Sequence, residues 1–538
     1  MQYAFYRFAI QLLQYIKNIK QKKAEIMNKN KQLAINLFSQ ITTFFITLGI
    51  SFFLSPFIVK HIGVEANGFV SLGNNFVGYA AILSTAINSM ASRFITIYYV
   101  KKDYKTSNEY FSSVFFANVI LSLVLLIPSI ILVLFIEQII NVPSGLVTDV
   151  KILWSFIFLN FIISLLASVF SVSTFATNKL YLSSIRNIIS QFIRVAVLVI
   201  SYTFFPKYIW YIGLASILQN IYTSFTNYQY TKKLTPELHI KREFLKREKI
   251  NNVLSSGIWN SINRLGSVLL ESLDLLIANI FIGSAEMGIL SVAKTIPSMI
   301  TNLIGTTIGV FMPTLTIDYA NSDKKALVKN MKMSMKITGL FTCVPIAVLV
   351  ILGEAFYSLW QPTLNSRKLQ ILAVLTVSGV LISGCFNVIF NIFTVANKVK
   401  LPALIQVGTG ALNTVIVLII VNISDLGIYA VAGVSSILCI IKNLLIIVPY
   451  GCKCIDIKST TFYPPLIRCL ASTAVTIGIG LIIIRYINIQ NWFIMILSAI
   501  VFVIIGLLSY LIICTNKEER QYMLNIFKKI IRKKEVHK

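Results

Sequence analysis

The chain has few charged and few metal-binding side chains for its length. Of its 538 residues, 13% are charged, only 20 are Asp or Glu, and the three histidines, His61, His239 and His537, lie far apart. A soluble domain is about a quarter charged, so the composition excludes a water-soluble fold of this size. The seven cysteines all lie between Cys343 and Cys514, mostly in apolar stretches. This spacing predicts neither a metal cluster nor a disulfide framework, and we expect no resident cofactor.

Long apolar runs dominate the sequence. Hydrophobic residues make up 56% of it, and the mean hydropathy is +0.78. A bilayer core needs about 20 apolar residues per helix. Windows of that length predict an all-α, polytopic membrane protein with 14 transmembrane helices, at residues 37–59, 68–99, 110–136, 152–175, 182–205, 208–228, 253–282, 288–315, 333–360, 369–395, 401–423, 427–449, 462–487 and 492–514.

The distribution of Lys and Arg predicts the orientation. With a cytoplasmic amino terminus, the segments expected inside hold 34 basic residues and those expected outside hold six. Cytoplasmic loops of membrane proteins carry this excess, so both termini are expected on the cytoplasmic side of the bacterial inner membrane. The net charge of +28 therefore indicates contact with anionic lipid headgroups rather than with nucleic acid.

The chain ends and one connection divide the sequence into segments. Residues 1–31 are typical of an amphipathic cytoplasmic segment at the membrane interface, although Met27 is an alternative natural start. Residues 515–538 form a second basic cytoplasmic segment. The longest cytoplasmic connection between spans, the basic linker at residues 232–249, divides the chain after six predicted spans.

Short matches between the two sides of this linker predict an internal repeat. At an offset of 220, Ile62, Gly63, Gly68 and Ser71 recur as Ile282, Gly283, Gly288 and Ser291; at an offset of 219, Asn178, Lys179 and Leu182 recur as Asn397, Lys398 and Leu401. The matches predict an N-lobe at residues 32–231, a C-lobe at residues 250–450 and two further helices at residues 451–514. Like-oriented repeats are an arrangement of transporters with a site between the lobes.

A few charges fall deep within the predicted spans, where each costs about 2.5–3.5 kcal/mol. The cations are Arg194, Arg264 and Lys294, with Lys442 at intermediate depth, and the acids are Glu271 and Asp274. We expect Asp274 to pair with Lys294, which leaves Arg264 and Arg194 facing a net positive cavity suited to a phosphate or pyrophosphate.

Two other interpretations of these charges stay open. The polar stripe of helix seven can neutralise itself and serve as structural packing between helices. Glu271 and Asp274 can instead couple transport to Na⁺ or H⁺.

Amide side chains accompany the charges. Asn74 lies on the second predicted span, and Asn260 and Asn263 lie on the seventh, beside Trp259. Amides and flat aromatic rings suit sugar hydroxyls and sugar faces, so these residues are candidate sugar ligands. The tryptophans alternatively anchor helix ends at the membrane interface.

The sequence around these charges resembles a known family. LLESLDLLIANIFIGSAEMGILSVAKTIPSM, at residues 269–299, is similar to the helix seven to eight region of Wzx-type polysaccharide flippases in the MATE-like MOP exporter superfamily. IGVEANGFVSL, at residues 62–72, and SMASRFITIYYVKKD, at residues 89–103, are similar to the family's helix two region. The family's recurring Asp, Gly, Gly-x-x-S, basic residue and proline are matched here by Asp274, Gly283, Gly288, Ser291, Lys294 and Pro297.

The resemblance implies 14 helices in two lobes, alternating access, and export of an undecaprenyl-pyrophosphate-linked oligosaccharide for surface polysaccharide biosynthesis. We expect a monomer without enzymatic activity that associates with polysaccharide assembly enzymes. One departure from the family is Asn74, where related lipid flippases can place an Arg.

Two other function classes remain as alternatives. A MATE-type drug or metabolite cation antiporter should expose acids rather than bases in its cavity. A polymerase or glycosyltransferase needs acid/base residues on a sizeable outer loop, but the longest outer connection, residues 137–151, carries only Glu137 and Asp149 as acids.

Overall fold

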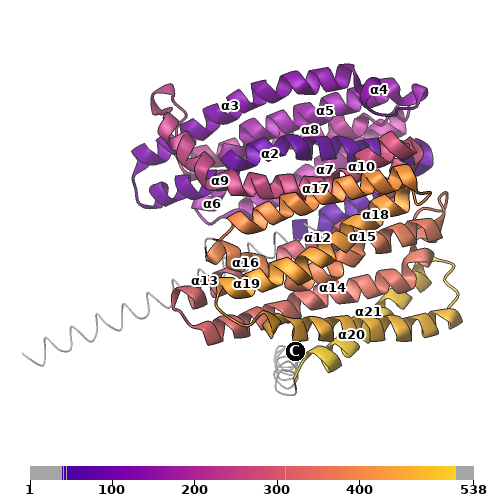
Figure 1. Cartoon of the computed structure of the whole chain (residues 1–538). Coiled ribbons are helices and arrows are strands. Elements are labelled where there is room, and N and C mark those ends of the chain that lie inside the picture. Colours follow the sequence, from indigo (N-terminus) through magenta and orange to yellow (C-terminus); the bar gives the residue numbers. More distant parts are fainter. Residues whose placement is uncertain (1–38, 40–41, 44, 309–310, 397, 517–538) are drawn as a thin grey trace, which may run out of the picture. The chain divides into compact units, whose positions relative to one another are not determined.

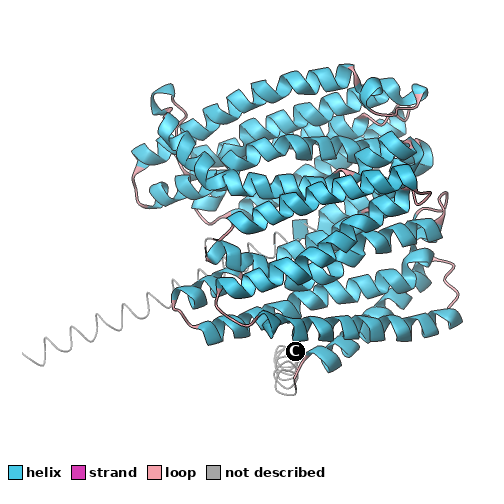
Figure 2. Ribbon diagram, in the orientation of Figure 1, coloured by secondary structure: helices cyan, strands magenta, loops and turns pink. Residues whose placement is uncertain are grey.

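The computed structural model of the protein describes residues 39, 42–43, 45–308, 311–396 and 398–516. The predicted amphipathic segment at residues 1–31 lies outside these ranges, as does the predicted basic tail apart from its first two residues. Within the described ranges all regular secondary structure is helical (Figure 2). An all-helical membrane fold is therefore established.

The helices are of three kinds, and Figure 1 labels most of the α-helices. The α-helices are α2 (Val64–Val100), α3 (Tyr104–Leu134), α4 (Ile136–Ile139), α5 (Val147–Ala167), α6 (Val172–Ala176), α7 (Leu180–Phe204), α8 (Tyr211–Leu234), α9 (Arg247–Ser267), α10 (Asp274–Ile277), α11 (Ser284–Ala293), α12 (Thr295–Ile308), α13 (Met312–Ala320), α14 (Lys324–Trp360), α15 (Ser366–Phe386), α16 (Val388–Val395), α17 (Lys400–Ile423), α18 (Ile428–Lys442), α19 (Val448–Cys454), α20 (Tyr463–Ile483) and α21 (Trp492–Cys514). Short 3₁₀ segments are η1 (Ser144–Leu146), η2 (Ser168–Ser171), η3 (Arg242–Phe244), η7 (Ser459–Phe462) and η8 (Ile484–Tyr486), and π-helical turns are η4 (Val268–Ser272), η5 (Ala278–Ile282) and η6 (Asn443–Ile447).

Eleven helical stretches in the described part of the chain are long and apolar enough to cross a membrane, and α11 with α12, bent by 41° between them, makes twelve if the pair is counted as one span. Two of the 14 predicted spans do not meet this standard. The first is described as a shorter apolar helix, Phe45–His61. The sixth corresponds to α8, whose apolar character is diluted by Gln219, Asn220 and other polar residues. The count of 14 therefore stays a prediction.

The helices group into two compact units. Unit 1 comprises the described residues of Met1–Leu54, Leu83–Leu134 and Lys151–Ile258, and unit 2 comprises those of Ser55–Ile82, Phe135–Val150 and Trp259–Lys538. The units do not follow chain order, because α2 and α9 are each divided between them. The lobes predicted at residues 32–231 and 250–450, with the two further helices at 451–514, stay a prediction.

Unit 1 holds the basic linker against α3. The Asn108 side chain donates to the Glu237 carbonyl (2.8 Å) and accepts from the His239 amide (2.7 Å). One turn further along α3, the Ser112 hydroxyl accepts from the Lys241 amide (3.2 Å). Buried Tyr110 and Phe111 of the same helix belong to the core beside this contact. The linker thus has a defined binding surface on α3.

Unit 2 contains the two repeat-related glycine segments that the sequence singled out. Gly63 and Gly283, at φ of 124° and 136°, directly precede α2 and α11 and adopt a backbone conformation that favours glycine. Gly68 and Gly288 lie against each other, because a Cβ placed on Gly68 would lie 3.0 Å from the Gly288 Cα. Equivalent residues in mutual contact are expected of two copies of one turn related by a local two-fold axis.

Two further glycines allow α9 and α17 to cross closely within unit 2. A Cβ on Gly266 would lie 2.5 Å from the backbone carbon of Gln406, and one on Gly410 would lie 2.7 Å from the Gly266 carbonyl oxygen. Small residues permit this approach between membrane helices. The crossing holds α17 beside the turn of helix that begins at Val268.

We predict that Gly410→Ala destabilises the protein by about 1–3 kcal/mol, because the added methyl meets backbone atoms that cannot move aside. Gly408→Ala is the matched control, since a Cβ at this exposed position of the same helix meets nothing within 4 Å. Alanine there should stabilise the helix slightly. Thermal unfolding of the purified protein in detergent tests the pair, and equal melting temperatures for the two variants would contradict the proposed packing.

Candidate functional site

The helical segment around Glu271 and Asp274 departs from regular α-helical geometry. After α9, the chain passes through the π-helical turn η4, the short helix α10 and a second π-helical turn, η5. A π-helical turn disturbs the regular i→i−4 hydrogen bonding and is frequent at functional sites. Its carbonyl groups need other partners, because no water is available in the membrane core.

Side chains from α2 and α17 supply some of these partners. Asn75 and Tyr79 of α2 both donate to the Ser272 carbonyl, at 2.9 and 2.8 Å. From α17, Asn413 donates to the Leu270 carbonyl at 3.2 Å. The turn is therefore held from two sides by polar groups that point at its backbone.

Lys294 supplies a further partner and also a charge. Its Nζ donates to the Glu271 carbonyl at 2.9 Å and to Oδ2 of Asp274 at 2.7 Å. Asp274 is buried, with 3% of its surface exposed. The predicted pair of Asp274 with Lys294 is thus present in the structure. Lys294 ends α11 at the point where the chain bends by 41° into α12, so the ammonium ties the bend to the irregular turn.

Beside this turn lies a cavity of about 610 Å³, entirely within unit 2. Polar and small side chains from α9 to α12 and from α15 to η6 surround it. The lining residues are Asn263, Ser267, Leu270, Glu271, Ser272, Asp274, Lys294, Pro297, Ser298, Thr301, Asn302, Ile304, Thr376, Gly379, Val380, Ser383, Gly384, Asn387, Phe390, Gln406, Ser435, Ser436, Cys439, Lys442 and Asn443.

Four charged residues line the cavity: Lys294, Lys442, Asp274 and Glu271. Lys442 is 5% exposed, and its Nζ donates to the neutral Oε1 of Gln406. Glu271 is exposed, and its carboxylate makes no hydrogen bond or ion pair with the residues that the structure describes. The cavity therefore contains one closed ion pair, one cation with an amide partner and one anion without a partner.

The formal charge of this cavity is balanced, with two ammonium groups and two carboxyl groups. Arg194 is not among the lining residues and belongs to α7 in unit 1. Its Nε is buried and has no hydrogen-bond partner among the described residues. The net positive chamber stays a prediction.

The other predicted ligands are distributed around the turn. Asn263 lines the cavity, whereas the exposed Arg264 points its guanidinium toward Gly78 of α2. Asn74 is exposed and donates to the Val70 carbonyl of its own helix at 2.9 Å. Asn260 is half-buried on α9. The structure thus brings Asn263 and Lys294 together at the cavity and leaves Arg264, Asn74 and Asn260 outside its lining.

Sequence reasoning missed the contribution of α17. Gln406, which accepts from Lys442, and Asn413, which caps the π-helical turn, are both buried. They lie seven residues apart on a span that is otherwise mostly apolar. Two amides at that helical spacing share one face. This pattern in the sequence could have indicated that α17 contributes polar side chains to the site.

A second, apolar groove of about 450 Å³ lies on the other side of α12. Ile296 and Ile300 of α12 line the groove, whereas Ser298 and Asn302 of the same helix line the polar cavity. The remaining groove residues come from α14 and α21 and are almost all apolar: Leu340, Phe341, Val344, Pro345, Val348, Leu349, Leu352, Gly353, Phe356, Met495, Ala499, Val503 and Leu507. One helix therefore separates a polar volume from an apolar one.

Two solved structures share this fold at low sequence identity. A MATE-family multidrug resistance transporter of the MOP superfamily, in an inward-facing conformation, aligns with a TM-score of 0.61 and 14% identity, over 77% of this chain and 94% of that chain. The lipid II flippase MurJ, in an inward closed conformation, aligns with a TM-score of 0.58 and 13% identity, over 90% of this chain and 97% of that chain.

The sequence comparisons identify the family. An uncharacterized membrane protein, EpsK of Bacillus subtilis (strain 168), is 28% identical over 499 residues, which are 93% of this chain and 98% of that protein. The model of the polysaccharide biosynthesis protein family matches residues 33–317, more than half of the chain. The chain therefore belongs to the polysaccharide biosynthesis protein family, on a fold shared with MOP-superfamily transporters.

Proposed function

We propose that the protein is a flippase that moves an undecaprenyl-pyrophosphate-linked oligosaccharide across the bacterial cytoplasmic membrane by alternating access, for surface polysaccharide biosynthesis. The observation that carries this proposal is the pair of volumes on either side of α12, one polar and one apolar. A lipid-linked sugar has a polar head and a long apolar tail, so a carrier needs a polar path next to a lipid-like one. The family and the fold shared with a lipid II flippase support this proposal.

Lys294 and Lys442 are the proposed ligands of the pyrophosphate in this cavity. The Lys294 ammonium already binds an anion, the Asp274 carboxylate, and Lys442 has only an amide partner. A pyrophosphate that enters the cavity can take the place of Asp274 at Lys294 and add a charge-assisted bond to Lys442. Because Lys294 lies at the bend between α11 and α12, this exchange would change what holds the bend. Arg264 and Arg194, which do not line this cavity, are proposed to contact the anionic headgroup elsewhere along its path.

Neutral polar groups around the cavity are the proposed contacts of the first sugars. Asn263, Ser298 and Asn302 offer amide and hydroxyl groups from two helices. Asn387 adds an amide from a third side. Such groups bind sugar hydroxyls without requiring a charged ligand. Asn74 and Asn260 are proposed to contact the glycan elsewhere along its path.

Glu271 is the proposed site of ion coupling. It is an exposed carboxylate in a cavity that otherwise holds a closed ion pair and an amide-bound lysine. Binding of Na⁺ or H⁺ would neutralise it and remove its repulsion of an anionic headgroup. Asp274 is the structural partner in this scheme, since it is buried and bound to Lys294.

The same carboxylate favours a second candidate function. A carrier of drug or metabolite cations needs an available acid in its cavity, and Glu271 meets that requirement. The fold shared with a multidrug resistance transporter also suits this function. The apolar groove beside α12 separates the two candidates, because a small cation does not require it.

The proposed setting follows from the charge distribution in the sequence. We place both termini on the cytoplasmic side of the inner membrane, where basic loops contact anionic lipids. The protein works as a monomer in this scheme and associates with the enzymes that assemble the polysaccharide.

We predict that Lys294→Ala lowers surface polysaccharide at least about tenfold, because a charge-assisted contact of about 1.5–3 kcal/mol is lost. The measurement is surface polysaccharide per amount of protein in the membrane, in cells that depend on this protein. Lys325→Ala, at an exposed lysine of α14, is the matched control and should leave export unchanged.

Lys294→Ala alone leaves the buried Asp274 carboxylate without its ion-pair partner, so it can destabilise the protein as well as remove a substrate ligand. A double variant distinguishes these two effects. Lys294→Met with Asp274→Leu removes both charges, a replacement that often preserves stability. If Lys294 binds the substrate, the double variant reaches the membrane but exports nothing. Restored export in the double variant would show that the pair serves only as packing.

We further predict that Glu271→Gln abolishes the response of transport to an imposed Na⁺ or pH gradient, since the amide cannot bind the coupling ion. Purified protein in proteoliposomes with a labelled lipid-linked oligosaccharide gives this readout. Asp425→Asn, which neutralises an exposed acid outside the cavity, is the control. An unchanged gradient dependence in Glu271→Gln would remove Glu271 from the coupling scheme.

The same proteoliposomes distinguish the two functions. The flippase proposal predicts translocation of the lipid-linked oligosaccharide and no efflux of a cationic dye. Efflux of the dye that is lost in Glu271→Gln, without any movement of the lipid-linked sugar, would replace the flippase by the cation antiporter.

A further inference from the structure

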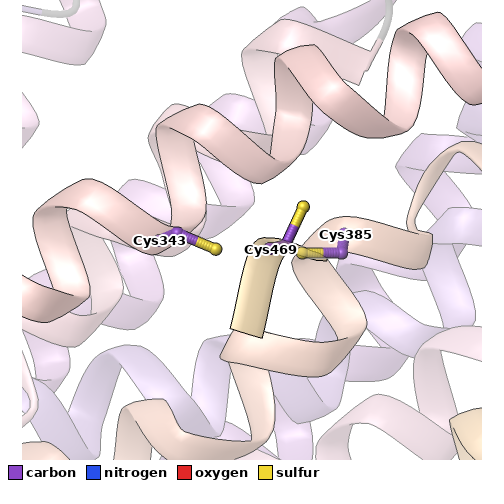
Figure 3. Close-up of side chains that lie close together, drawn as sticks. All are labelled: Cys343, Cys385 and Cys469. Carbon is purple, nitrogen blue, oxygen red and sulfur yellow. The ribbon is translucent and has the colours of Figure 1, made fainter. Parts of the chain in front are cut away.

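Three cysteines from three different helices meet inside unit 2. Cys343 of α14, Cys385 of α15 and Cys469 of α20 have their sulfur atoms within 4.8 Å of one another (Figure 3). Each side chain is at most 1% exposed. The wide spacing of the cysteines in the sequence predicted no such cluster, because only the packing of the helices brings these positions together.

The backbone and a tyrosine shape the space around the sulfurs. Gly339 of α14 faces the cluster, and a Cβ at this position would lie 2.8 Å from Sγ of Cys469. The hydroxyl of Tyr510 donates to the Lys336 carbonyl at 2.6 Å and lies 3.2 Å from Sγ of Cys469. Because the tyrosine proton is engaged with the carbonyl, the tyrosine oxygen is the acceptor and the Cys469 thiol is the donor. The position of this sulfur is thus held independently of the other two.

We propose that Cys343, Cys385 and Cys469 form a binding site for a soft cation of the Cu⁺ or Zn²⁺ class. A metal–sulfur bond of about 2.3 Å requires sulfur atoms about 4 Å apart, so the cluster reaches this geometry through small rotations about the Cα–Cβ bonds of the three cysteines. Thiol and thiolate ligands select soft ions over Mg²⁺ or Ca²⁺. Three sulfurs match a trigonal site for Cu⁺, whereas a structural Zn²⁺ site needs a fourth ligand.

A candidate fourth ligand lies in the same core. Cys514, the last residue of α21, is buried and belongs to the hydrophobic cluster that contains the three cysteines. Zn²⁺ would therefore bind ligands from four helices, α14, α15, α20 and α21, whereas Cu⁺ would bind ligands from α14, α15 and α20 alone. The two ions thus predict different sets of protected cysteines.

The number of ligands fixes the number of protons released, because cysteine binds a metal ion as the thiolate. Cu⁺ bound by the three cysteines would displace three thiol protons to water, and Zn²⁺ bound by these three and Cys514 would displace four. The bound ion would cross-link α14, α15 and α20 and so stabilise the packing of α20 against the rest of unit 2.

The test uses the purified full-length protein in detergent, reduced and freed of metal by a chelator. Cu⁺ or Zn²⁺ is added with a competing chromophoric chelator, unbound metal is removed by gel filtration, and metal per chain is measured by mass spectrometry. We expect about one ion per chain, and binding weakened more than about tenfold in Cys343→Ser, Cys385→Ser and Cys469→Ser, because a ligand is lost. Cys454→Ser is the matched control, since this buried cysteine of the same core lies outside the cluster.

A second measurement uses the unaltered protein, so the proposal can be tested even if the cysteine variants do not fold. Alkylation of thiols during slow thermal unfolding, read by peptide mass spectrometry, should show Cys343, Cys385 and Cys469 protected by the metal and Cys454 unprotected. Protection that extends to Cys514 identifies the Zn²⁺ form. Wild-type protein without bound metal, equal binding in all four variants, or a disulfide between two cluster cysteines would each overturn the proposal.

Discussion

One ammonium group holds together the irregular part of the molecule. Lys294 binds the Asp274 carboxylate and the Glu271 carbonyl at the same time, at 2.7 and 2.9 Å. Both acceptors lie where the helix departs from regular geometry, and the donor lies where the next helix bends. In a bilayer, an unsatisfied carbonyl and an unpaired carboxylate are both costly. The irregular turn, the bend and the buried acid are therefore mutually dependent, and the cavity beside them exists because all three are held in place.

The bend has a consequence for the arrangement of surfaces. It turns α12 so that serine and asparagine side chains face the cavity while Ile296 and Ile300 face an apolar groove. Neither volume alone is specific to one substrate class. A polar cavity suits many transported solutes, and an apolar groove in a membrane protein binds acyl chains generally. Their separation by a single helix matches a molecule with a polar head and an apolar tail.

The sequence predicted the features that depend on apolar runs and on the depth of charged residues within the predicted spans. Apolar windows located the helices, with α8 and Phe45–His61 falling short of the apolar standard because of polar content or length. The Asp274–Lys294 pair followed from two charges at equal depth on consecutive spans. Gly63 and Gly283, which the sequence matched, both have positive φ, whereas the internal repeat itself stays a prediction. These features are local, or depend on one neighbouring helix.

Features that depend on several helices were beyond the sequence. The π-helical turn η4 exists because Asn75, Tyr79 and Asn413 arrive from α2 and α17 to bind its carbonyls. Lys442 lines the cavity because α18 turns that face toward it, and the sequence alone does not determine how the helix is rotated. The meeting of Cys343, Cys385 and Cys469 is set by helix packing across more than a hundred residues of chain. In each case the local residues permit several outcomes, and tertiary contacts select one.

We propose that the protein binds the head and the tail of one lipid together, and binding to the purified protein tests this proposal most directly. Native mass spectrometry can compare polyprenyl pyrophosphate with polyprenyl alcohol of the same length and with inorganic pyrophosphate. We predict that polyprenyl pyrophosphate binds more tightly than either fragment and loses this advantage when Lys294 and Asp274 are replaced together by Met and Leu. Equal binding of the pyrophosphate and the alcohol, unaffected by that replacement, would contradict it.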